Sequence, residues 1–150
     1  MQKLRFSTVI QAPRNEVWEA MLGDEGYRTW TAAFGPGSHY VGDWNQGSEI
    51  LFLAPGEGGK MMGMVSRIKE SRPQEYVSIE HLGVFEDGKK DTSSAAAQGW
   101  AGNLENYTLR DKDGGTEVVV ELDTADEYKE MFEGTWPNAL QKLKELAEHR

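Results

Sequence analysis

His81 and Glu105 are the residues whose type and position could support acid–base chemistry. In the segment 76–82, strand alternation places His81 on one face with Val77 and Ile79, which are β-branched and apolar. We expect this face to point inward, so that an imidazole, whose charge changes near neutral pH, lies on an apolar wall. It could bind a ligand or act as a general base, or it could be a core histidine hydrogen-bonded to a neighbouring strand.

Glu105 shares a strand face with Tyr107 and Leu109. If Tyr107 points inward, Glu105 does too, and a carboxylate beside an imidazole could take part in proton transfer. Glu105 could equally be a solvated residue at a pocket rim or an ion-pair partner of Arg67. The sequence leaves these three roles open and assigns no catalytic residue.

Other site chemistries have little support in the sequence. His39, His81 and His149 are far apart and there is no cysteine, so we expect no metal site and no cofactor. No G-x-S-x-G motif occurs, and the serines at 93–94 lie in a low-complexity stretch without a nearby histidine. The glycines of 56–59 enclose an acidic residue and precede no helical pattern, which predicts a flexible hairpin rather than a phosphate-binding loop.

The candidate residues fall in a series of predicted antiparallel strands. Short Gly- or Pro-bearing connections at 45–47, 72–74 and 113–115 separate alternating segments. The longer segments 54–60 and 86–102 are rich in Gly, Ser and Ala and are expected to be mobile loops. The predicted strands of this region are 39–44, 48–53, 63–71, 76–84, 104–110 and 116–123.

Further elements flank this run of strands. Alternation predicts a first strand over 4–10, and helical spacing of apolar residues predicts a helix over 13–22 that ends at Gly23. Asp24 is suited to cap a second short helix, which the Gly-Pro-Gly segment 35–37 ends.

The C-terminal segment 125–149 has the clearest helical pattern, with apolar residues at steps of three and four. Its roughly 25 residues would form a helix about 37 Å long. Gly134 and Pro137 lie inside it and predict a bend, or alternatively a break with Thr135 capping the second helix. One long helix and several antiparallel strands predict an α+β fold in which a curved sheet wraps around the C-terminal helix, with a space between them.

Bulky side chains could line this space. The chain has five Trp, five Tyr, five Phe and six Met. Most are expected in the core, and adaptable residues near the mouth would suit an apolar ligand. Trp136 is expected at the mouth against the segment 86–102, which carries Trp100. The predicted pocket-lining residues are Trp30, Phe34, Phe52, Met64, His81, Trp100, Tyr107, Phe132 and Trp136.

Size and charge exclude several classes of protein. A chain of 150 residues is expected to form a single domain, residues 1–150. No apolar run approaches the ~20 residues of a membrane-spanning helix, and the mean hydropathy is −0.64. The formal net charge of −9 disfavours nucleic acid and anionic membrane surfaces as partners. The N-terminus has no pattern of a secretory signal, so a cytoplasmic location is expected.

Several segments together resemble the START-like (SRPBCC) superfamily. The resemblance is closest to the branch related to the C-terminal domain of the activator of the heat-shock protein 90 ATPase, and it spans nearly the whole chain in the family's order. The segments are FSTVIQAPRNEVWEAM, residues 30–37, YVGDWNQGSEILFL, GMVSRIKESRP, IEHLG, ENYTL and MFEGTWPNALQKLKELAE.

The resemblance implies a helix-grip fold with an internal cavity that holds an apolar small molecule in many relatives. Our leading hypothesis is therefore binding of an apolar or amphipathic small molecule or a lipid. A cyclase- or hydrolase-type enzyme using His81 is one alternative, and a co-chaperone-like interaction module that contacts the chaperone is another. A homodimer is compatible with each of these hypotheses.

Overall fold

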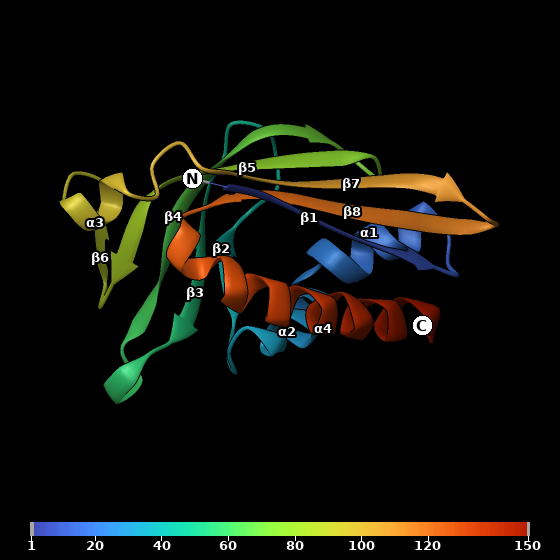
Figure 1. Cartoon of the computed structure of the whole chain (residues 1–150), viewed down its shortest axis with the longest axis horizontal. Coiled ribbons are helices and arrows are strands. Elements are labelled where there is room, and N and C mark those ends of the chain that lie inside the picture. The colour runs from blue at the N-terminus through green and yellow to red at the C-terminus, as the bar shows by residue number, and fades with distance from the viewer. Residues whose placement is uncertain (1, 150) are drawn as a thin grey trace.

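A computed structural model describes residues 2–149 and shows a curved antiparallel sheet with helices on one side (Figure 1). The strands are β1 (Gln2–Ile10), β2 (His39–Gly42), β3 (Glu49–Pro55), β4 (Met61–Arg72), β5 (Tyr76–Glu86), β6 (Lys89–Asp91), β7 (Leu104–Lys112) and β8 (Gly115–Thr124). The α-helices are α1 (Arg14–Leu22), α2 (Asp24–Trp30), α3 (Ala95–Gln98) and α4 (Lys129–Glu148). Short 3₁₀ turns occupy Thr31–Ala33, Glu57–Gly59 and Asp126–Tyr128.

The strands follow the order β1-β8-β7-β5-β4-β3-β2, and every neighbouring pair is antiparallel. β6 forms a hairpin with the end of β5. α4 crosses the inner side of the sheet and packs on β1, with α1 and α2 beside it (Figure 1). This arrangement confirms the predicted α+β helix-grip fold.

The apolar stripe of the C-terminal segment explains the position of α4. Its buried side chains are spaced by three and four residues, so they share one face of the helix. This face closes the core that the sheet leaves open. The buried residues of α4 are Trp136, Ala139, Leu140, Leu143 and Ala147.

The structure refines two sequence expectations about the last helix. α4 begins at Lys129, after a 3₁₀ turn, and runs unbroken through Gly134 and Pro137 to Glu148. The alternative of two helices separated at Thr135 is therefore wrong. No helix within residues 2–149 is long and apolar enough to cross a membrane.

The segment 86–102, expected to be a mobile loop, contains both β6 and α3. The Ser94 hydroxyl accepts a hydrogen bond from the backbone N–H of Ala97 and so caps α3. Ala97 is itself fully buried. Short-range capping and one buried methyl group therefore give order to a stretch whose composition suggested none.

Candidate functional site

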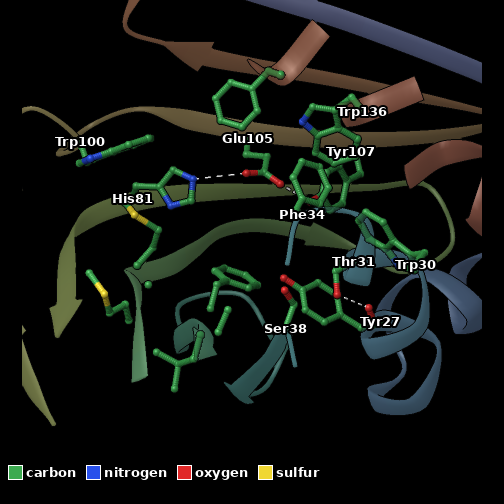
Figure 2. Close-up of a pocket in the computed structure, with 17 residues that line it drawn as sticks. Tyr27, Trp30, Thr31, Phe34, Ser38, His81, Trp100, Glu105, Tyr107 and Trp136 are labelled. Atoms are coloured by element: carbon green, nitrogen blue, oxygen red, sulfur yellow. Dashed lines mark hydrogen bonds and ion pairs between the residues drawn. The ribbon is translucent and has the colours of Figure 1, made fainter. Parts of the chain in front are cut away.

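A pocket of about 250 Å³ lies between the sheet, α4 and the end of α2 (Figure 2). All nine residues predicted to line a pocket are found around it. Glu105, for which a place at the pocket rim was one of three possible roles, also lines the pocket. The other lining residues are Tyr27, Thr31, Ser38, Leu53, Ala54, Met62 and Gly63.

Aromatic rings form the wall of the pocket on the side of α4. The ring centroid of Trp136 lies 4.9 Å from Phe34, 5.7 Å from Trp30 and 6.1 Å from Tyr107. Edge-to-face and tilted contacts at these distances are favourable packing arrangements for aromatic side chains. The wall is thus one continuous aromatic cluster drawn from α2, the segment after it, β7 and α4.

Trp136 is part of the inner wall, and the expectation that it lies at the pocket mouth is wrong. Its side chain is 3% exposed and belongs to the hydrophobic core. Trp100 instead stacks on Tyr128, with ring centroids 5.3 Å apart, and meets the edge of His81. The rotation of α4, set by its whole apolar stripe, turns Trp136 toward the sheet rather than toward the segment 86–102.

A polar group of residues faces this aromatic wall, beginning with His81 on β5. Val77, Ile79 and His81 are all buried, as their shared strand face predicts. Ser66 on β4 lies directly opposite His81 because Leu82 is an extra residue in a β-bulge of β5. Ser66 Oγ and His81 Nδ1 are 2.7 Å apart.

Glu105 on β7 reaches the other side of the imidazole. Glu105 Oε1 lies 3.4 Å from His81 Nε2, and the Tyr107 hydroxyl donates a hydrogen bond to Glu105 Oε2 (Figure 2). The side chain of Glu105 is 22% exposed. Arg67 pairs with Glu80, so the suggested Glu105–Arg67 ion pair is not formed.

Burial and this carboxylate control the ionisation of two pocket tyrosines. Burial raises the pKa of Tyr107 well above its usual value, and the negative charge of Glu105 raises it further. Burial also raises the pKa of Tyr27, again with a contribution from the charge of Glu105. Both hydroxyls therefore stay protonated at neutral pH and can donate hydrogen bonds.

Two residues of the site were not predicted from the sequence: Ser66, which contacts His81, and Tyr27, which lines the pocket. Tyr27 lies on α2, and its ring packs against Trp30, Tyr40, Trp44 and Phe52. Tyr27 and Trp30 are three residues apart and share the buried face of α2, but only the tertiary packing shows that this face reaches the pocket. Nothing in the local sequence around Ser66 indicated its partner.

The arrangement can enclose an apolar body and contact one polar group at the His81–Glu105 end. Within residues 2–149, no cluster of three or more His, Asp or Glu side chains could hold a metal ion. The adjacent imidazole and carboxylate are of the types used in proton transfer.

Similar structures come from several bacteria. The protein ChR145 from Cytophaga hutchinsonii has a TM-score of 0.72 at 23% identity, covering 99% of this chain and 95% of its own. Protein NE0264 from Nitrosomonas europaea has a TM-score of 0.74 at 14% identity, covering 98% and 94%. The Aha1 dimer from Colwellia psychrerythraea has a TM-score of 0.69 at 18% identity, covering 99% and 97%. At these identities the likeness shows the shared fold.

No curated protein matches this sequence. A family described as Activator of Hsp90 ATPase homolog 1-like protein matches residues 11–148, nearly the whole chain. This match and the shared fold confirm the START-like resemblance seen in the sequence. The chain belongs to the family of Activator of Hsp90 ATPase homolog 1-like proteins.

Proposed function

We propose that this protein binds an apolar or amphipathic small molecule in the pocket between the sheet and α4, acting as one cytoplasmic domain over residues 1–150. The observation that carries the proposal is the composition of the pocket wall. Aromatic, Met and aliphatic side chains form most of it, and the polar groups gather around Glu105 and His81. A concave, mostly apolar site with a few convergent polar groups is typical of small-molecule binding.

Binding can be tested by filling the pocket. Ala54 lines the pocket from β3, so Ala54→Trp is expected to occupy part of its volume. A neutral apolar fluorophore, N-phenyl-1-naphthylamine, is expected to bind saturably to the original protein and much more weakly to Ala54→Trp. Val41→Trp on the neighbouring β2 is the matched control, because Val41 is exposed and lies outside the pocket.

The control should bind the fluorophore as the original protein does. Equal binding by all three proteins would mean that the fluorophore attaches to the surface. Absence of saturable binding to the original protein would count directly against a ligand-binding pocket.

A second candidate function is a cyclase- or hydrolase-type enzyme that uses His81. The 3.4 Å separation of His81 Nε2 and Glu105 Oε1 supports it, since both groups line the pocket. His81→Gln should then abolish turnover of an aryl ester or a polyketide-like thioester while ligand affinity changes little. Turnover that is unaffected by His81→Gln would remove this candidate.

Chaperone contact and dimer formation are proposals carried by the family and its structures. The family name refers to activation of the Hsp90 ATPase, and the Colwellia psychrerythraea protein is described as a dimer. The exposed large apolar residues within the described chain are Phe34, Val41, Met62 and Met131. Stimulation of Hsp90 ATPase activity that Met131→Glu abolishes would support a chaperone contact. Sedimentation measurements over a range of concentrations test the dimer.

A further inference from the structure

The pocket lining has one acidic side chain and no Lys or Arg. Glu105 is the only Asp, Glu, Lys or Arg among its 17 lining residues. His81 is the one lining residue with an imidazole, and its Nε2 faces Glu105 directly. The formal net charge of the whole chain is −9, so the long-range field also attracts cations.

Several hydroxyl groups of the pocket already donate hydrogen bonds to acceptors within the protein. Thr31 Oγ1 donates to the carbonyl of Tyr27, and Ser38 Oγ donates to the carbonyl of Gly35 over 2.6 Å. The hydroxyl of Tyr107 donates to the carboxylate of Glu105. What these three oxygens can still offer a ligand is acceptor capacity, since a hydroxyl has one proton and two lone pairs.

The imidazole nitrogens of His81 and the indole nitrogens of Trp30 and Trp136 are also hydrogen-bonded, close to a partner or covered. Ser66 Oγ lies against Nδ1 of His81, and Nε2 of the same ring points at Glu105 (Figure 2). The indole N–H of Trp136 has no partner within residues 2–149, but surrounding atoms cover it completely. A ligand carboxylate would therefore meet the like charge of Glu105, with the Tyr27 hydroxyl among the few donors left to contact it.

The carboxylate of Glu105 keeps unused acceptor capacity on the ligand side. It receives one hydrogen bond from Tyr107 and lies beside one imidazole nitrogen, whereas an ionised carboxylate has about four lone-pair sites. Around it stand the rings of Phe34, Tyr107 and other lining aromatics (Figure 2). Aromatic ring faces attract cations, and an adjacent carboxylate adds direct charge pairing.

We propose that this pocket selects ligands with an apolar, ring-sized body that bears a protonated amine, with the ammonium group held by Glu105 and the body enclosed by the aromatic wall. The proposal rests on the proposed binding function and adds the sign of the ligand's charge. The like charge of Glu105 disfavours fatty-acid-like anions.

Three probes with one common body test this directly: 2-naphthylmethylamine, 2-naphthylmethanol and 2-naphthoate. Calorimetric titration of the original protein at neutral pH should rank the amine first and the carboxylate last, with the amine bound about tenfold more tightly than the alcohol. Raising the salt concentration should weaken amine binding more than alcohol binding, because charge pairing is screened.

Glu105→Gln is the decisive variant, since it removes the charge while its amide oxygen can still accept from Tyr107. In this variant the affinity for the amine should fall to within about threefold of the affinity for the alcohol. The affinity for the alcohol should stay within about twofold of its value in the original protein. Glu121→Gln is the matched control: it makes the same change of net charge on β8, outside the pocket. It should leave the ranking unchanged.

The outcomes separate the two proposals. Equal binding of amine and alcohol, or strongest binding of 2-naphthoate, by the original protein would overturn the amine preference and leave the binding function standing. An unchanged amine preference in Glu105→Gln would overturn the role of Glu105. Failure of all three probes and of the neutral fluorophore to bind would overturn the binding function itself.

Discussion

Ser66 and His81 face each other across β4 and β5, with Ser66 Oγ 2.7 Å from His81 Nδ1. Ser66 is fully buried and is not among the pocket-lining residues. Its hydroxyl therefore positions the imidazole from behind, and Nε2 is left to face Glu105 and the pocket. The β-bulge at Leu82 creates this pairing, because without the extra residue a different side chain would stand opposite Ser66.

Ser66→Ala should lower the free energy of unfolding by about 1–3 kcal/mol, because a buried ring nitrogen of His81 loses its partner. Urea unfolding measures the change. Ser7→Ala is the matched control, since Ser7 is an exposed serine in β1, and it should change stability by less than about 0.5 kcal/mol. Equal effects of the two substitutions would show that the Ser66–His81 contact contributes nothing to stability.

The burial of Trp136 predicts that its main role is in the core. Trp136→Ala should cost about 3–5 kcal/mol of unfolding free energy, as expected for loss of a buried aromatic side chain. Phe132 lies one helical turn earlier on α4 and is only partly buried, so Phe132→Ala should cost less while still weakening probe binding. Calorimetric unfolding of both variants without ligand makes the comparison, and a larger loss for Phe132→Ala would contradict it.

Local sequence patterns predicted the part of the site that lies on single strands. Alternation placed His81 on one face with Ile79, and Glu105 on one face with Tyr107, because a strand presents alternate residues to one side. The apolar neighbours of His81 then predicted that its face points inward. Ser66 could not be predicted, since its contact depends on the register between two strands and on a bulge at Leu82.

The errors at α4 and at 86–102 have a similar physical origin. Periodicity identified the buried face of α4 but not which part of the sheet Trp136 would meet, because that depends on how the whole helix docks. In the segment 86–102, α3 is only four residues long, too short for a periodic pattern. Its order comes from the cap at Ser94 and the burial of Ala97, which composition does not reveal.

The raised pKa values of Tyr27 and Tyr107 predict a loss of stability in alkali. Burial first, and then the charge of Glu105, favour the neutral phenols in the folded protein, whereas both ionise near pH 10 when unfolded. Their contribution is complete below about pH 10 and is lost as the pH rises above it, by about 1.4 kcal/mol per pH unit for each tyrosine. Urea unfolding at a series of alkaline pH values measures this slope.

Tyr107→Phe provides the comparison for the alkaline slope. Phenylalanine cannot ionise, so the variant should lose stability less steeply above about pH 10 than the original protein. It also leaves Glu105 without its hydrogen bond, and this cost should appear at neutral pH as a constant offset. The same alkaline slope in both proteins would mean that Tyr107 ionises in the folded state as readily as in the unfolded one.

Gly134 and Gly26 provide opposite tests of glycine in helices. Gly134 is exposed in α4, and a Cβ atom there would meet no atom within 4 Å. Gly134→Ala should therefore raise the free energy of unfolding by about 0.5–1 kcal/mol, because alanine restricts the unfolded chain and favours the helix. Thermal unfolding should show a corresponding increase in Tm.

Gly26 in α2 should respond in the opposite direction. A Cβ atom at this position would lie 2.0 Å from the backbone oxygen of Ala20, so α2 could not keep its close approach to α1. Gly26→Ala should lower the free energy of unfolding by about 1–3 kcal/mol, the usual cost of overpacking a tight contact. Because α2 carries Tyr27 and Trp30 into the pocket, the same substitution should also weaken binding of the neutral fluorophore. A gain in stability from Gly26→Ala would show that α2 can move away from α1 at little cost.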